Sequence, residues 1–181
     1  MKKNVFLVAL FVFGHLTITA QTAKKINGPV IKEYGSTYLV ENPDIVTETD
    51  SEMKVIFDID KSSEDKSELN GYIEVAARFL NMHTNLGMKP EQLKAAMTIH
   101  AGAIQDVLNN DAYKEKYGVD NPNAKLILAL IDHGVNVIVC GQSAAKHDIS
   151  HEDMIPGVKI ALSATTALIQ YQNKGYSFVK Y

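Results

Sequence analysis

The chain has 181 residues, of which 46% are apolar and 22% are charged, a composition typical of one globular domain rather than two. Its net charge of -3 is too small to keep it unfolded, and no cluster of lysines or arginines favours a nucleic-acid partner. The single cysteine, Cys140, excludes an intramolecular disulfide, a CxxC redox pair and a zinc site of four thiolates.

The first twenty residues have the pattern of a secretory signal peptide. Lys2 and Lys3 precede an apolar run over 5–13, and Ala20 provides the small residue expected at the cleavage site. A transmembrane anchor is the less favoured alternative, because this run is shorter than the ~20 residues that span a bilayer. Cleavage would leave 16 basic and 21 acidic groups, a net charge of -5. We therefore expect a periplasmic or secreted protein with no membrane attachment after cleavage.

Residues 21–52 are interrupted by the pairs Gly28-Pro29, Gly35-Ser36 and Asn42-Pro43. Such punctuation, with only brief apolar runs between the pairs, predicts an extended leader that lies along the domain formed by 53–181.

Strands and helices alternate from residue 53 onward. Compact apolar runs predict strands, and apolar residues at three- and four-residue spacing predict helices. The expected strands are 54–60, 93–100, 135–140, 158–162 and 176–180, and the expected helices are 67–86, 103–109, 121–133 and 164–173. This alternation predicts an α/β fold, a three-layer α/β/α sandwich around a mainly parallel five-stranded sheet.

The helix expected around 124–131 is apolar on nearly its whole circumference, with Lys125 as its only charge. Such a helix must be covered on more than the side that faces the sheet. Burial under the leader and a subunit interface are both open at this point.

Polar side chains stand where four of the expected strands end: Asp60, His100, Cys140 and Ser163. Ligands bind outside the carboxyl ends of the strands in a parallel sheet, so this edge is the expected functional site. Asp60 and Ser163 also have a simpler interpretation, since polar residues resume where strands end and serine is a natural helix cap.

Cys140 ends an apolar strand and is followed by Gly141 and Gln142. A free cysteine there is often just a small buried apolar residue. The alternative is a reactive thiolate, because a turn that opens a short helix would place backbone amides beside the sulfur.

His147 and His151 lie four residues apart, a spacing that suits a metal on one helix. Ser150 and Asp153, however, have the spacing of a capping box, which would put His147 before the helix and separate the two rings. We therefore expect no metal site. GxSxG, GxGxxG and Walker motifs are also missing from the sequence, and no cofactor is expected.

Four segments form a recognisable combination: Asn121-Pro122-Asn123 with the apolar helix after it, GVNVIVCGQ over 134–142, VKIALS over 158–163 and QNKGY over 172–176. Together they resemble the DsrE/DsrF-like family, specifically its exported branch, and VCGQ and ALSATT are the most specific parts. The resemblance covers about 54–181 and implies an α/β/α sandwich that assembles as trimers or hexamers. Cys140 matches the cysteine that carries sulfane sulfur as a persulfide in the sulfur-relay members. His100 matches a histidine that the family usually follows with glycine, whereas here Ala101 stands before Gly102.

The resulting hypothesis is a homo-oligomeric sulfur carrier or sulfurtransferase-like protein. Cys140 would be the nucleophile, with amides of Gly141 and Gln142 beside it, and His100 or His147 would supply a cation or a proton. Asp60 and Ser163 would complete the substrate site. A chain with one cysteine must pass its sulfur to a separate thiol or acceptor protein. The alternative is a non-catalytic, oligomeric binding or assembly module in which Cys140 is structural.

Overall fold

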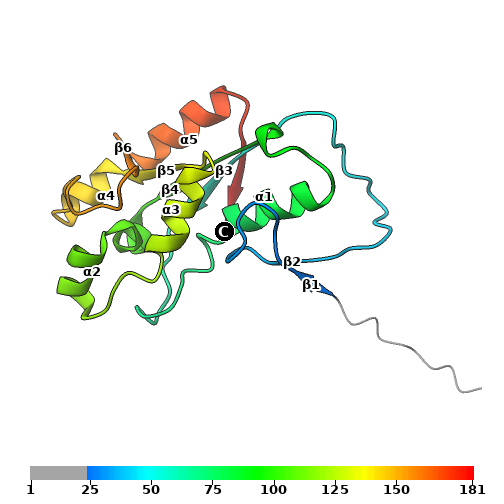
Figure 1. Cartoon of the computed structure of the whole chain (residues 1–181). Helices are drawn as coiled ribbons and strands as arrows, with labels where there is room; N and C mark the ends of the chain where they lie inside the picture. Colours follow the sequence, from blue (N-terminus) through cyan, green and yellow to red (C-terminus); the bar gives the residue numbers. More distant parts are fainter. Residues whose placement is uncertain (1–23) are drawn as a thin grey trace, which may run out of the picture.

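The computed structural model describes residues 24–181, and the expected signal peptide lies outside this range. The core is a five-stranded sheet in the order β6-β5-β4-β3-β7, and every neighbouring pair is parallel (Figure 1). Its strands are β3 (Met53–Ile59), β4 (Leu93–Ile99), β5 (Asn136–Cys140), β6 (Lys159–Ala161) and β7 (Ser177–Lys180). The predicted five-stranded parallel sheet is thus confirmed.

Helices cover both faces of this sheet (Figure 1). On one face, α1 (Val75–Asn85) packs against β4 and α3 (Ala124–Asp132) against β5; α5 (Ala164–Asn173) lies across all five strands on the other. Side chains alternate accordingly: Val55 and Phe57 enter the main core with α1 and α3, whereas Ile56 is fully buried outside that cluster. The three-layer sandwich is confirmed.

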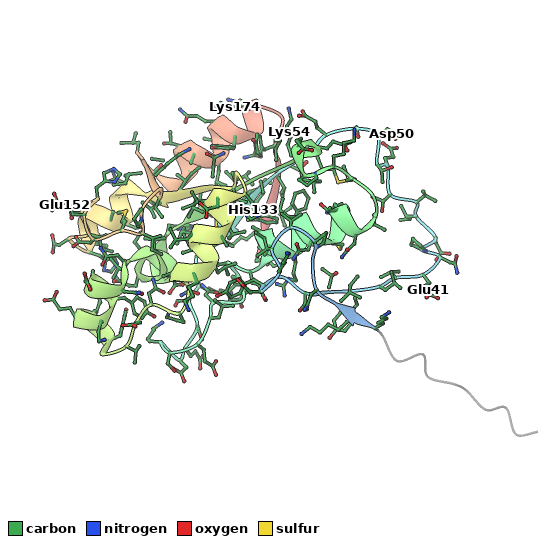
Figure 2. The ribbon with its side chains drawn as sticks, in the orientation of Figure 1. Glu41, Asp50, Lys54, His133, Glu152 and Lys174 are labelled. Carbon is green, nitrogen blue, oxygen red and sulfur yellow. The ribbon has the colours of Figure 1, made fainter. Side chains whose placement is uncertain are left out.

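The segment before β3 packs on α1. Its two short strands, β1 (Lys25–Ile26) and β2 (Thr37–Tyr38), pair antiparallel. The buried Asn81 of α1 ties this segment down, because its Oδ1 accepts the Ile31 amide at 2.9 Å and its Nδ2 donates to the Tyr34 and Gly35 carbonyls at 2.9 and 3.0 Å. Residues 39–52 then pass around the end of α1 to reach β3, and Glu41 and Asp50 mark this path in Figure 2.

The start of the first long helix differs from the prediction. A helix was expected from residue 67, but α1 begins at Val75. The reason is tertiary: the buried Asn70 donates its amide to Asn123 Oδ1 at 2.8 Å and its Nδ2 to Asp106 Oδ2 at 2.7 Å. These bonds hold 67–74 in turns instead of a helix.

The region between β4 and β5 also differs. The tight helix η2 (Ala101–Val107) replaces the helix expected at 103–109, and α2 (Asn110–Tyr117) was not expected. Asn109 caps α2 by accepting the Ala112 amide at 2.9 Å, and Gly118, with φ +77°, ends it. Two short helices complete the chain, η1 (Pro90–Gln92) and α4 (Gly141–Lys146).

The expected capping box forms without its helix. Asp153 Oδ2 accepts the Ser150 amide at 2.8 Å and the Ser150 hydroxyl at 2.7 Å, but the residues that follow form turns. These bonds close a local loop, so the prediction of a helix after Ser150 is wrong.

The apolar helix α3 is covered largely by its own chain. Leu126, Ile127 and Leu130 are fully buried, and a side chain at Gly157 would stand 3.0 Å from Ile131 Cγ2. The side-chain bonds that hold the leader come from α1, its preceding residue Glu74, η1 and β3, and none of them comes from α3 within the described residues. Packing beside η2 and Gly157 accounts for much of the apolar surface of α3, and Leu128 remains 40% exposed. Within 24–181, no helix combines the length and apolarity that a membrane span requires.

Candidate functional site

The carboxyl ends of β3, β4 and β5 bring Asp60, His100 and Cys140 into one row. Ile59 aligns with Ile99, and Ile99 aligns with Val139, so the three residues that follow occupy the next position on neighbouring strands. Adjacent strands lie ~4.8 Å apart. His100 and Cys140 are thus side by side at the sheet edge, on the face covered by α5.

The sulfur of Cys140 is surrounded by hydrogen-bond donors. The residue is 6% exposed, and burial alone would raise the pKa of its thiol. The Ser143 and Ala164 amides, the Ser143 hydroxyl and the Gln142 amide outweigh burial and hold the pKa of Cys140 below its ordinary value of 9.0. The site therefore favours the thiolate, the nucleophilic form of cysteine.

Ser143 was not expected among the site residues. Its hydroxyl donates toward the Cys140 sulfur and accepts the Ala101 amide at 3.3 Å, so it links α4 to the end of β4. The sequence carries one signal for it: a serine three residues after a cysteine at the expected start of a helix faces back toward the first turn.

Gly141 and Gln142, the two residues after Cys140, contribute to the site in different ways. A Cβ at Gly141 would lie 2.6 Å from the Ala161 carbonyl oxygen, so glycine allows the close approach of β6; its amide is not among the donors to sulfur. The Gln142 amide does reach the sulfur, and its side-chain Nε2 donates to the Leu162 carbonyl at 3.3 Å.

A buried carboxylate orients His100. Its Nε2 is 2.9 Å from Asp58 Oδ1, which also accepts the Thr98 hydroxyl at 3.0 Å. Because a carboxylate only accepts, Nε2 carries the proton and Nδ1 is left as the acceptor of a neutral ring. Lys180 Nζ adds a cation 3.2 Å from Asp58 Oδ2. The sequence analysis did not predict Asp58 or Lys180 as site residues. Asp58 lies within a strand rather than at its end, and Lys180 is near Asp58 because β7 pairs with β3.

Asp60 shares the same lysine. Its Oδ2 lies 2.9 Å from Lys180 Nζ, and this hydrogen bond lowers the pKa of Asp60. The other oxygen, Oδ1, is buried and has no hydrogen-bond partner in the described part of the chain. Asp60 thus adds negative charge to the row and is matched by Lys180.

Ala101 follows His100 in a left-handed conformation, with φ +49°. This region suits glycine, which lacks the Cβ that crowds the backbone there. Gly102 then passes close to β3, because a Cβ there would lie 3.1 Å from the Asp60 carbonyl oxygen. Ala101 therefore holds a backbone conformation that is strained for a residue with a side chain.

The remaining site residues divide into two groups. Ser163 caps α5, since its Oγ accepts the Thr166 amide at 3.0 Å, and it thereby fixes the Ala164 amide beside Cys140. His147, by contrast, is exposed at the end of α4 and lines a separate pocket of about 410 Å³ with Gln105 and Asp153. No contact in 24–181 joins His147 to Cys140, nor do three or more metal-binding side chains cluster there.

This arrangement can perform nucleophilic sulfur chemistry. It places a donor-stabilised thiol beside an imidazole whose orientation is fixed by a carboxylate, at the edge where parallel sheets bind ligands. His100 Nδ1 has no hydrogen-bond partner among the described residues and is available to accept a proton.

Comparisons with known proteins identify the family of this fold. The sequence profile of the DsrE/DsrF-like family matches residues 54–181. The protein of unknown function MTH1491 from Methanobacterium thermoautotrophicum is similar in structure, with 15% identity, a TM-score of 0.55, and 72% of this chain and 100% of that chain covered. The ychN protein from E. coli is similar too, with 16% identity, a TM-score of 0.51, and 71% and 99% covered.

No curated protein matches this sequence. The two solved structures establish the fold, and the profile match covers the sheet from Lys54 onward, including the Cys140 row. The chain belongs to the DsrE/DsrF-like family.

Proposed function

We propose that this protein is a sulfur carrier or sulfurtransferase-like protein that holds sulfane sulfur on Cys140 as a persulfide. The observation that carries the proposal is the set of donors around the Cys140 sulfur, three amides and the Ser143 hydroxyl, which favour the thiolate. Membership of the DsrE/DsrF-like family, which includes sulfur-relay proteins, supports the same chemistry.

The loading step is a thiol exchange. The Cys140 thiolate attacks the outer sulfur of a persulfide or polysulfide donor, a new S–S bond forms at Cys140, and the donor S–S bond breaks. His100 Nδ1 accepts the proton of the Cys140 thiol as the thiolate forms, and the departing donor thiolate takes that proton, or one from water. Sulfane sulfur moves without net oxidation, so no further reactant is needed.

Unloading requires a second molecule. Cys140 is the only cysteine of the sequence, so no resolving thiol exists in the chain. An acceptor thiol, from a protein or a small molecule, attacks the outer sulfur of the Cys140 persulfide and regenerates the thiolate. The signal-like first twenty residues support a periplasmic or secreted setting for this exchange.

A homo-oligomer, a trimer or hexamer, is part of the proposal. Ile160 and Leu162 flank the strand end beside Cys140 and are 39% and 72% exposed, and Ile169 on α5 is 53% exposed. Contact between copies over these side chains would cover the apolar surface next to the site. Light scattering after size-exclusion chromatography measures the oligomer, and a monomer at all concentrations contradicts this part.

Intact-mass measurement after treatment with polysulfide tests the central claim. We expect an adduct of one sulfur atom, about 32 Da, on the native protein and none on Cys140→Ser. His100→Gln should load more slowly, whereas His133→Gln, a matched change at an exposed histidine on the far end of α3, should load normally. The absence of an adduct on native protein would refute the proposal.

The alternative, a binding or assembly module with a structural cysteine, rests on the 6% exposure of Cys140. In that case an Ellman-type reagent reacts with the thiol only after denaturation, and Cys140→Ala lowers stability without loss of any sulfur transfer. Titration of the native thiol separates the two functions.

A further inference from the structure

A large cavity opens away from the Cys140 row, between the leader, α1 and the edge strand β7. Its volume is about 1040 Å³, at the upper end of the ~300–1000 Å³ typical of small-molecule sites. It lies on the α1 side of the sheet, where neither α1 nor α3 covers β7. Lys54 lines the cavity, and Figure 2 shows it well away from Glu152, which lies at the far left of the view.

The floor and walls of this cavity are apolar and aromatic. Phe57 and Val179 contribute the floor from β3 and β7, and Phe57 packs against Phe79 of α1 with ring centroids 6.1 Å apart. Tyr38 of the leader and Tyr181 stand at the opening and are 58% and 47% exposed. Aromatic groups this exposed around a cavity provide apolar surface for a ligand to bury.

One cation stands out at the rim. Lys54 is paired with Glu52 at 3.0 Å, so its charge is matched within the lining. Arg78, the only arginine of the chain, lines the same cavity from α1, and its ion pair, with Glu74, is longer. Its guanidinium donates to the Gly71 carbonyl at 3.2 Å, and its closest carboxylate oxygen, on Glu74, is 3.8 Å away.

A guanidinium has five N–H donors in a planar fork that fits a carboxylate with two hydrogen bonds. Arg78 uses one of them on Gly71 in the described residues, while Glu74 accepts the Gly35 amide through Oε1 at 2.9 Å. The fork therefore has donors available at the mouth of an apolar cavity. The other 17 basic residues of the chain are lysines, whose ammonium group cannot form the two parallel hydrogen bonds that a guanidinium forms with a carboxylate.

We propose that this cavity binds an amphipathic small molecule with an apolar body and one carboxylate head, the body lying over Phe57 and Phe79 and the head on Arg78. The binding site is separate from Cys140, which points to the α5 face, and it does not depend on the proposed sulfur chemistry. The cavity lies beside the leader residues that Asn81 binds. A ligand that contacts Tyr38 would therefore also hold the leader against α1.

Calorimetric titration of the purified protein with decanoate below its micellar concentration tests the proposal. We expect saturable one-to-one binding, and decyltrimethylammonium, with the same tail and the opposite charge, should bind at least ~10-fold more weakly. Arg78→Gln should weaken decanoate binding at least ~10-fold. Lys125→Gln, which removes an exposed cation of α3, should have no effect.

A second variant tests the location. Ser177 is exposed on β7 and lines the cavity, so Ser177→Trp places a large ring inside it and should abolish binding, provided its circular dichroism matches the native protein. Equal binding of both charged amphiphiles, or binding insensitive to both variants, would overturn the proposal. So would a protein dimer that Ser177→Trp dissociates in the absence of any decanoate binding, because the cavity would then receive a second copy.

Discussion

Replacing Ala101 by glycine should stabilise the protein. Ala101 has φ +49° and an exposed side chain, so the change relieves backbone strain without removing buried surface. The left-handed conformation costs a non-glycine residue about 1–2 kcal/mol, which glycine avoids. Glycine also gives the unfolded chain more conformational freedom, and this lowers the stability by roughly 0.4–1 kcal/mol. The net gain is about 1 kcal/mol, or roughly 2–4 °C in Tm for a chain of this size.

Urea unfolding of the native protein and Ala101→Gly measures this gain as a higher midpoint at unchanged slope. Ala145→Gly is the matched control, because Ala145 is exposed but helical, and there glycine should cost about 0.5–1 kcal/mol. The Ala101 amide still donates to Ser143 in the variant, so the site geometry is retained. An equal or lower midpoint for Ala101→Gly would show that the strain argument is wrong.

Three further predictions concern the pKa of Cys140, a buried carboxyl and the leader. Alkylation of native protein should reach half its maximal rate below pH 9.0, and Ser143→Ala should move that midpoint upward, because one donor to the thiolate is lost; an unchanged midpoint contradicts the role of Ser143. Burial raises the pKa of Asp106 above 3.8, so the folded state binds its proton more tightly and the free energy of unfolding should fall as pH rises from about that value. Urea titrations of Asp106→Asn should lack that fall, and a variant with the native pH profile would exclude Asp106 as its source. Asn81→Ala removes five hydrogen bonds to residues 30–35 and should cost at least ~2 kcal/mol, with faster proteolysis within 39–52 as the direct readout; native proteolysis rates would argue against Asn81 as the anchor.

Local pattern was sufficient for the sheet and for part of the site. Each core strand is a compact apolar run bounded by turns, and the row of Asp60, His100 and Cys140 follows from the ends of three such runs. Signals for α2 were also present, since Asn109 before it and Gly118 after it are a standard cap and stop.

Long-range contacts account for what the pattern could not reveal. The late start of α1 depends on bonds from Asn70 to Asn123 and Asp106, far along the chain. The pairing of Asp58 with His100 and Lys180 requires knowing that β3 lies between β4 and β7. Strand order is set by the packing of the whole domain, so no window of sequence contains it.

The position of β7 also sets an order of assembly. Lys180 contacts Asp58 and Asp60 across 122 and 120 positions of the chain, and β7 follows the other four strands of the sheet in the sequence. Strands β3, β4 and β5 can pair before β7 is added, and this pairing already aligns His100 with Cys140. Until β7 pairs, one edge of β3 is open, and Asp58 and Asp60 lack the ion pair with Lys180. Such an edge invites pairing with other chains. Closure by the last strand therefore completes the charge balance of the site and removes a route to aggregation in the same step.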